Sequence, residues 1–223
     1  MANNYFKVLR GGTHTTFQDN GFVNKQNLGI TAGGAIDYEL FALSNKILKN
    51  PINIPVLEFC FQGPSLKLIN GNARIIITGN VLFNIITSKK IYPGMAFKSY
   101  LLREGDIIDV LSTVKSNYGY LSVQGGFKLK KEFNSSSTLT ISKIGSNNGS
   151  KILDNQMIFF NKKGSKKSSN INYIFKEFSN FINVIPGPQM NYFFPKIIKK
   201  FFNISFTITN TSNRMGIRLN GNV

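Results

Sequence analysis

The chain has 223 residues, of which 42% are hydrophobic, and its 27 Lys and Arg against 10 Asp and Glu give a formal net charge of +17. No run of roughly eighteen apolar residues is present, which argues against a membrane-spanning helix, and the single Cys60 excludes an internal disulfide framework and a multi-cysteine zinc site. The first residues lack the basic-then-apolar order of a secretory signal. We therefore expect a cytoplasmic protein without a membrane partner.

The positive charge is spread along the chain, with short lysine clusters at 128–131, 162–167 and 196–200. A surface that binds nucleic acid usually gathers its Lys and Arg on one face or element. The accompanying richness in Asn, Ile and Phe is typical of a compositional bias instead. Nucleic-acid binding therefore stays a rival hypothesis, and nucleic acid is not the expected partner.

Short strands separated by Gly, Pro and Asn turns are predicted for most of the chain. In chain order they cover residues 6–10, 55–61, 65–69, 73–78, 81–87, 107–112, 119–124 and 138–144. Asn70-Gly71 between two apolar runs predicts a β-hairpin. Many short strands with frequent turns favour a barrel or a sandwich.

Two helices are expected. Apolar residues recur at helical spacing from Tyr38 to Lys49, with Asp37 placed as the N-cap and Asn50-Pro51 as the stop. The second helix is expected over Met190–Phe202, with Pro195 in its first turn.

The Lys-, Ser- and Gly-rich segment 161–172 predicts a connector between two parts. Residues 1–172 are expected to form a first β-barrel region, and residues 173–223 the start of a second β unit with strands at 181–185, 204–209 and 214–219. Two or three strands and one helix can barely bury their apolar faces. We therefore expect this second unit to be incomplete, and to be completed by a partner chain or by a further C-terminal portion.

The residue types exclude several kinds of catalytic site. The only histidine is His14, so any Ser-His or Cys-His mechanism would depend on this one residue as its base. The sequence also contains no G-x-x-x-x-G-K-[ST] phosphate loop. No metal-ligand cluster is present, and no metal is expected. What remains is a set of polar loops, each of which could also be plain turn or cap chemistry.

These loops resemble, in order, those of the biotin-dependent carboxyltransferase-like family. The stretches that carry the resemblance are VLRGGTHTTFQDNG, GITAGGAID, LEFCFQGPSLKL, YLSVQGGF, SSST, VIPGPQMNYF and SNRMGIRLNG. The family includes the C-type subunit of bacterial 5-oxoprolinase, subunit 2 of allophanate hydrolase, the carboxyltransferase part of urea carboxylase and a sporulation-associated antagonist of a kinase inhibitor. The resemblance spans the whole chain and implies a mainly β, cyclophilin-like β-barrel with a few short helices.

The family's functional positions carry over with several differences. Gln18, Asp19 and Gly21 match a Gln-Asp-x-Gly-Arg pattern in which Phe22 replaces the Arg. Gly34, Ala35 and Asp37 match Ser-Gly-Ala-Met-Asp. The remaining matches are Ser136 and Thr138 in a Ser-Arg-Ser-Thr-Asp pattern that lacks its Arg and Asp, Gly187, Pro188 and Gln189 in Gly-Pro-Gln, and Arg214, Met215 and Gly216 in Asp-Arg-Met-Gly.

The resemblance implies roles for these residues. Gln18, Asp19, Gln189 and Arg214 are the expected catalytic residues. Gln189 would donate to an oxyanion, Arg214 would hold a carboxylate or a phosphorylated intermediate, and Asp19 would orient a donor or a lactam nitrogen. The expected substrate-binding residues are Asp37, which mainly caps its helix, Ser136, Thr138, Gly187, Pro188, Met215 and Gly216.

The leading interpretation is one component of an ATP-dependent 5-oxoprolinase, which opens the lactam of 5-oxoproline to glutamate together with B-like and A-like partner subunits. ATP would act in the complex, and no cofactor is expected on this chain. One alternative is a component that transfers a carboxyl group from carboxybiotin to urea or a related amide. The other is a non-catalytic regulatory binding protein.

Overall fold

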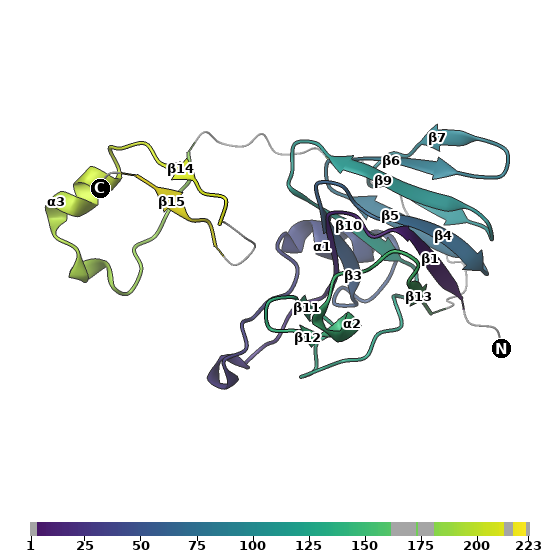
Figure 1. Cartoon of the computed structure of the whole chain (residues 1–223), viewed down its shortest axis with the longest axis horizontal. Helices are drawn as coiled ribbons and strands as arrows, with labels where there is room; N and C mark the ends of the chain where they lie inside the picture. Colours follow the sequence, from purple (N-terminus) through teal and green to yellow (C-terminus); the bar gives the residue numbers. More distant parts are fainter. Residues whose placement is uncertain (1–3, 162–172, 174–180, 212–215, 222–223) are drawn as a thin grey trace. The chain divides into compact units, whose positions relative to one another are not determined.

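The apolar strands of the first part of the chain form two antiparallel sheets in the computed structural model, which describes residues 4–161, 173, 181–211 and 216–221 (Figure 1). The six-stranded sheet runs in the order β13 (Met157–Phe159), β1 (Tyr5–Arg10), β4 (Ser65–Asn70), β9 (Ile107–Thr113), β6 (Val81–Ile86), β7 (Ile91–Pro93). The five-stranded sheet runs β2 (His14–Gln18), β3 (Val56–Cys60), β10 (Tyr118–Val123), β5 (Ala73–Thr78), β8 (Ser99–Leu102). The mainly β class is confirmed.

The expected closure into a barrel is wrong for the described residues, because their strand pairings keep the two sheets separate. The core explains how two open sheets suffice. Buried side chains of both sheets, such as Phe6 and Leu66 from one and Leu57 and Ile75 from the other, belong to one hydrophobic cluster. Facing sheets bury their apolar surfaces without the strand stagger that closure requires.

The predicted hairpin at Asn70-Gly71 is also wrong. β4 and β5, which flank this turn, belong to different sheets and do not pair. The turn chemistry is as expected, since Gly71 has φ +89°. A turn residue sets the local reversal, whereas the burial of each strand decides which neighbour it pairs with.

Several strand boundaries differ from prediction. The expected strand 138–144 is instead a hairpin of β11 (Thr138–Leu139) and β12 (Ile144–Gly145). The short strands β2, β7, β8 and β13 carry too few residues to show a clear alternation, and the sequence did not predict them. They lie at or next to sheet edges, where tertiary pairing rather than local pattern decides.

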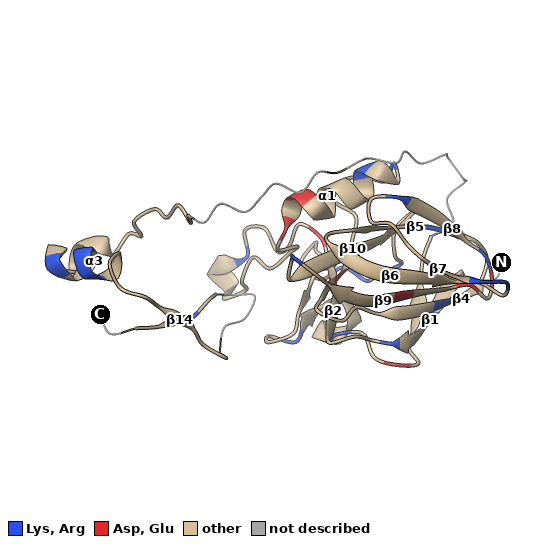
Figure 2. Ribbon diagram, turned by 90° about the horizontal axis from the view of Figure 1, so that it is seen from above, with Lys and Arg blue, Asp and Glu red and all other residues tan. Residues whose placement is uncertain are grey.

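α1 (Tyr38–Ile47) confirms the first predicted helix and packs on β5 and β10. Asp37 is its N-cap, with Oδ1 accepting a hydrogen bond from the Leu40 N–H at 3.0 Å. Glu39 in the first turn and Lys46 in the last complement the helix dipole (Figure 2). The helix ends slightly early, because Lys49 takes a left-handed φ of +55°.

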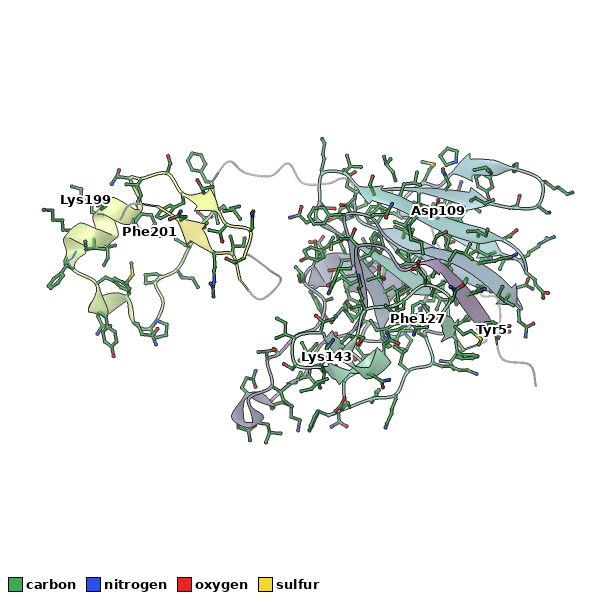
Figure 3. The ribbon with its side chains drawn as sticks, viewed as in Figure 1. Tyr5, Asp109, Phe127, Lys143, Lys199 and Phe201 are labelled. Atoms are coloured by element: carbon green, nitrogen blue, oxygen red, sulfur yellow. The ribbon has the colours of Figure 1, made fainter. Side chains whose placement is uncertain are left out.

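Phe127, just after β10, shows how the chain closes over the core between the sheets. Its ring, labelled in Figure 3, meets that of Phe17 edge to face, with the centroids 5.5 Å apart. Its backbone forms an isolated antiparallel bridge with Phe160. This bridge joins the segment around Phe160, near the end of the first part of the chain, to the segment that follows β10.

The chain divides into two compact units, Met1–Tyr173 and Ile174–Val223. The first unit also contains η1 (Gln26–Leu28) and α2 (Ser146–Gly149). In the second, the expected helix 190–202 is split into η2 (Met190–Tyr192) and α3 (Pro195–Phe201), with Pro195 starting α3 rather than lying inside a longer helix.

The strands of the second unit are shorter than predicted. β14 (Thr207–Ile208) pairs with β15 (Leu219–Asn220), and residues 181–185 form no strand. The predicted strand 214–219 begins outside the described residues. None of the described residues of this unit is buried. Within the parts that the structure describes, no helix is long and apolar enough to cross a membrane.

A buried acid anchors the start of α1 to the sheet. Glu58 on β3 is 2% exposed, and its Oε2 accepts hydrogen bonds from the Ile36 N–H and the Tyr120 hydroxyl, both at 2.9 Å. The Tyr120 oxygen in turn accepts the Asp37 N–H at 2.8 Å. Burial raises the pKa of Tyr120 above its usual 10, and the neighbouring Glu58 carboxylate raises it further.

This network predicts a pH-dependent loss of stability. A phenol whose pKa is raised by folding stabilises the protein below about pH 10 and loses that contribution as pH rises above it. We expect Tyr120→Phe to cost about 1–3 kcal/mol of unfolding free energy at pH 7, and the difference from the wild type to shrink above about pH 10. Urea unfolding at several pH values measures it. The exposed Tyr38→Phe is the control, and an equal pH dependence in both variants would contradict the prediction.

Candidate functional site

The carboxylate of Asp19 joins two loops that lie far apart in the sequence. Its Oδ1 accepts hydrogen bonds from the Gly21 N–H at 2.9 Å and from the hydroxyls of Ser135 and Ser137 at 2.7 and 2.6 Å. Its Oδ2 accepts the Ser136 N–H at 2.6 Å. Asp19 is only 7% exposed, so these donors replace the water that the charge loses on burial.

Because a carboxylate offers about four acceptor positions, Asp19 is close to saturated as it lies. Its geometry is that of a group that holds the 135–137 segment in place. Ser136 contributes its backbone N–H, and Thr138 is 2% exposed and donates its hydroxyl to the Ser146 carbonyl at 3.0 Å. The structure thus brings the predicted residues Asp19, Ser136 and Thr138 together.

Gln18 belongs to the same cluster and is fully buried. Its Nε2 donates to Thr16 Oγ1 at 2.9 Å and to the Thr138 carbonyl at 3.0 Å. Its Oε1 has no hydrogen-bond partner among the described residues. The side chain ties β2 to β11, next to the Asp19 network.

The two glycine-containing stretches around Asp19 and Asp37 pack backbone against backbone. The Ala35 N–H donates to the Asp19 carbonyl at 3.0 Å, and the Phe22 N–H donates to the Ala32 carbonyl at 2.6 Å. A Cβ on Gly21, which has φ +82°, would lie 2.2 Å from the Ala32 oxygen. Only glycine allows this approach, which explains why the polar loops contain glycine at this point.

Phe22, which takes the place of an arginine in the family pattern, is fully buried. It forms a small apolar cluster with Ile30 and Leu139, against which Ile144 packs. Asp37, by contrast, caps α1 with its side chain, which agrees with its expected supporting part. The structure therefore contains an apolar contact where the family pattern has a positive charge.

A pocket of about 460 Å³ opens beside Asp19. Three segments line it: residues 19–25, residues 53–55 and residues 131–134, and the lining side chains include four asparagines, Asn20, Asn24, Asn53 and Asn134. Ile54, Pro55 and Phe133 supply apolar surface. Of the predicted catalytic and substrate-binding residues that the structure describes, only Asp19 lines this pocket.

Two lysines set the charge of the pocket. Lys25 is half-buried and Lys131 is exposed, and neither ammonium group has an ion-pair partner within the described ranges. The described lining contains one acid, Asp19, so two ammonium groups against one carboxylate leave the lining with a net positive charge. The pocket therefore offers amide groups and positive charge, which suits a small anion such as a carboxylate.

The other predicted residues belong to the second unit. Gly187, Pro188 and Gln189 form an exposed turn before η2, where the Met190 N–H donates to the Gly187 carbonyl at 3.0 Å. Gly216 is exposed, and Arg214 and Met215 lie outside the described residues. Their expected convergence with Asp19 stays a prediction, because the two units are described separately.

Sequence reasoning missed several of the residues that build the site. A lone acid within the apolar run Val56–Cys60 could have marked Glu58 as a buried, hydrogen-bonded carboxylate. No local pattern marks Lys25, Lys131 or Phe133, because their segments meet only in the fold. In the described part of the chain, no group of His, Cys, Asp and Glu could hold a metal ion.

Comparison with known proteins matches the chain to one family model. The model, described as "Carboxyltransferase domain, subdomain A and B", covers residues 28–223. Among curated proteins, urea amidolyase of Saccharomyces cerevisiae is 27% identical over 96% of this chain but 12% of its own length. The C-type subunit of the Haemophilus influenzae 5-oxoprolinase is also 27% identical, over 96% of this chain and 68% of its own length.

Solved structures share the fold. The urea amidolyase of K. lactis superposes with a TM-score of 0.83 at 24% identity, covering 100% of this chain and 14% of that one. The urea carboxylase of Kluyveromyces lactis gives 0.81 at 24%, covering 100% and 21%. The chain thus corresponds to a small part of the large urea-acting proteins and to about two thirds of the 5-oxoprolinase relative.

The Asp19 network predicts a large cost for losing its charge. We expect Asp19→Asn to lower the unfolding free energy by about 2–4 kcal/mol, because the amide offers one fewer acceptor oxygen and directs N–H groups at existing donors. Urea unfolding at pH 7 measures the loss. The control is Asp154→Asn. Asp154 is exposed and, among the described residues, accepts only the Gly11 N–H at 2.7 Å, so this change should cost less than about 1 kcal/mol. Equal losses would show that Asp19 is an ordinary turn residue.

Proposed function

Because the chain belongs to the family of the carboxyltransferase domain, subdomain A and B, we propose that it is one component of an ATP-dependent 5-oxoprolinase. In this proposal it acts with B-like and A-like partner subunits to open the lactam of 5-oxoproline. Support comes from the C-type 5-oxoprolinase subunits of Haemophilus influenzae and Escherichia coli, of which the chain spans 68% and 69%.

The observation that carries the proposal is the pocket beside Asp19, where Lys25 and Lys131 stand among amide side chains with no ion-pair partner in the described part of the chain. 5-Oxoproline bears a carboxylate, which two ammonium groups would hold by charge-assisted hydrogen bonds. Its ring amide would meet the asparagine side chains, which can both donate and accept. Such a grip fixes the substrate so that a reacting group can approach the carbonyl carbon.

The chemistry requires donors that stabilise charge developing on the lactam oxygen. Gln189 and the N–H groups near Gly187 are the proposed donors, and Arg214 is the proposed guanidinium for a carboxylate or a phosphorylated intermediate. ATP would be used in the complex, with its site on a partner. Asp19, which accepts four hydrogen bonds from the surrounding loops, would position the pocket wall rather than transfer a proton.

A second candidate is carboxyl transfer from carboxybiotin to urea or a related amide. It is favoured by the similarity to urea amidolyase of Saccharomyces cerevisiae, which is 27% identical over 96% of this chain. Urea carries no charge, so the two lysines would have no partner on that substrate. The lysines could still face the carboxylate of carboxybiotin, and the two candidates must therefore be separated by activity.

The decisive experiment mixes the chain with A-type and B-type partner subunits and measures glutamate released from 5-oxoproline with ATP. We expect turnover only with all components. Carboxylation of urea by a biotin-containing complex would favour the second candidate. Partner binding without either activity would favour a regulatory protein.

The pocket lysines give a sharper prediction. In the active complex, Lys25→Gln or Lys131→Gln should each raise KM for 5-oxoproline by about 5- to 30-fold, because each removes one charge-assisted contact. Lys7→Gln on β1, an exposed lysine outside the pocket, is the matched control and should leave KM unchanged. Equal KM values in all variants would remove this pocket from substrate binding.

A further inference from the structure

The turn that forms one wall of the pocket has an unfavourable backbone. Glu132 and Ser135 exchange two backbone hydrogen bonds, at 2.8 and 2.9 Å, around the two-residue turn Phe133-Asn134. Both turn residues lie in the left-handed region, Phe133 with φ +48° and Asn134 with φ +68°. Turns of this kind favour Asn-Gly or Asp-Gly, whereas a bulky aromatic residue in the first position is strained.

The turn is held firmly at both ends. Ser135 donates its hydroxyl to Asp19 at 2.7 Å, and Glu132 Oε2 accepts the Gly145 N–H at 2.7 Å. Phe133 is 43% exposed although its main chain is fixed, so its ring lines the pocket instead of joining the core. Phe133 differs from other strained, exposed residues such as Phe61 because it also lines a pocket, and this combination indicates a functional use of its side chain.

We propose that Phe133 is the specificity residue of the pocket, packing its ring on the flat face of a cyclic amide that carries a carboxylate. This inference rests on the proposed function and adds the feature that selects a ring. Lys25 and Lys131 would hold the carboxylate, and the asparagines would meet the amide edge. Phe133, with Ile54 and Pro55 beside it, would cover the apolar ring face.

The test compares two phenylalanines that share the same backbone strain. Phe61 has φ +53° and is 59% exposed, but it lies outside the pocket. In each Gly variant the release of strain offsets the added chain entropy, so both Tm values should stay within about 3 °C of the wild type. Only Phe133→Gly should raise KM for 5-oxoproline, by about 10-fold with kcat within about two-fold. An unchanged KM in Phe133→Gly overturns the inference.

Selectivity for a ring gives a second readout. Succinamate is an open-chain amide with a carboxylate, and the ratio of its Ki to KM for 5-oxoproline should fall about 10-fold in Phe133→Gly. Phe133→Tyr should keep the wild-type ratio because the ring face remains. If Phe133→Leu also keeps it, bulk rather than an aromatic face is what matters, and the inference fails.

The two proposals fail separately. If the wild-type complex has no 5-oxoprolinase activity, both the proposed function and this inference are wrong. The complex could instead be active, with KM raised by the lysine variants but not by Phe133→Gly. That result would support the proposed function and contradict only the role of Phe133.

Discussion

One buried carboxylate determines how the polar loops of this protein are arranged. Asp19 accepts hydrogen bonds from Gly21 beside it and from Ser135, Ser136 and Ser137, more than a hundred residues away. Taking a charge out of water is costly unless every acceptor finds a donor. The loops therefore have little freedom to move apart, and the pocket that they line inherits that rigidity.

A second buried acid performs a related task for the neighbouring glycine-containing stretch that leads into α1. Glu58 accepts the Ile36 N–H and the Tyr120 hydroxyl, and so fixes the entry to α1. An acid-poor chain thus places two of its ten acids where they satisfy backbone N–H groups of loops that the sheets alone cannot pair. With these loops held in place, Lys25 from one segment and Lys131 and Phe133 from another line the same pocket.

The second unit differs from the first in how little of its apolar surface is buried. Its apolar residues, including Phe194, Ile185 and Phe202, are largely exposed, and its two-residue strands form a minimal sheet. In its described part, Lys196, Lys199 and Lys200 lie on a helix of seven residues beside Phe201 (Figures 2 and 3). Such a unit has little core of its own, and the roles proposed for Gln189 and Arg214 belong to the proposed complex with partner subunits.

Much of the architecture could be predicted from local sequence patterns. Apolar runs between Gly, Pro and Asn turns marked the central strands, helical spacing with Asp37 marked α1, and motif order identified the family. Each of these signals depends on near neighbours in the chain. Strand pairing could not be predicted from local pattern. Asn70-Gly71 predicts a chain reversal, but only the burial of both sheet faces decides that β4 and β5 belong to different sheets. The same holds for the site. The sequence by itself determined that Asp19 and the serines near 136 were polar loop residues. Only the tertiary structure decided that they bind each other beside a pocket lined by Asp19, Lys25, Lys131 and Phe133. The physical reason is that the whole fold, rather than any single segment, decides whether a charge loses its water and finds donors in exchange.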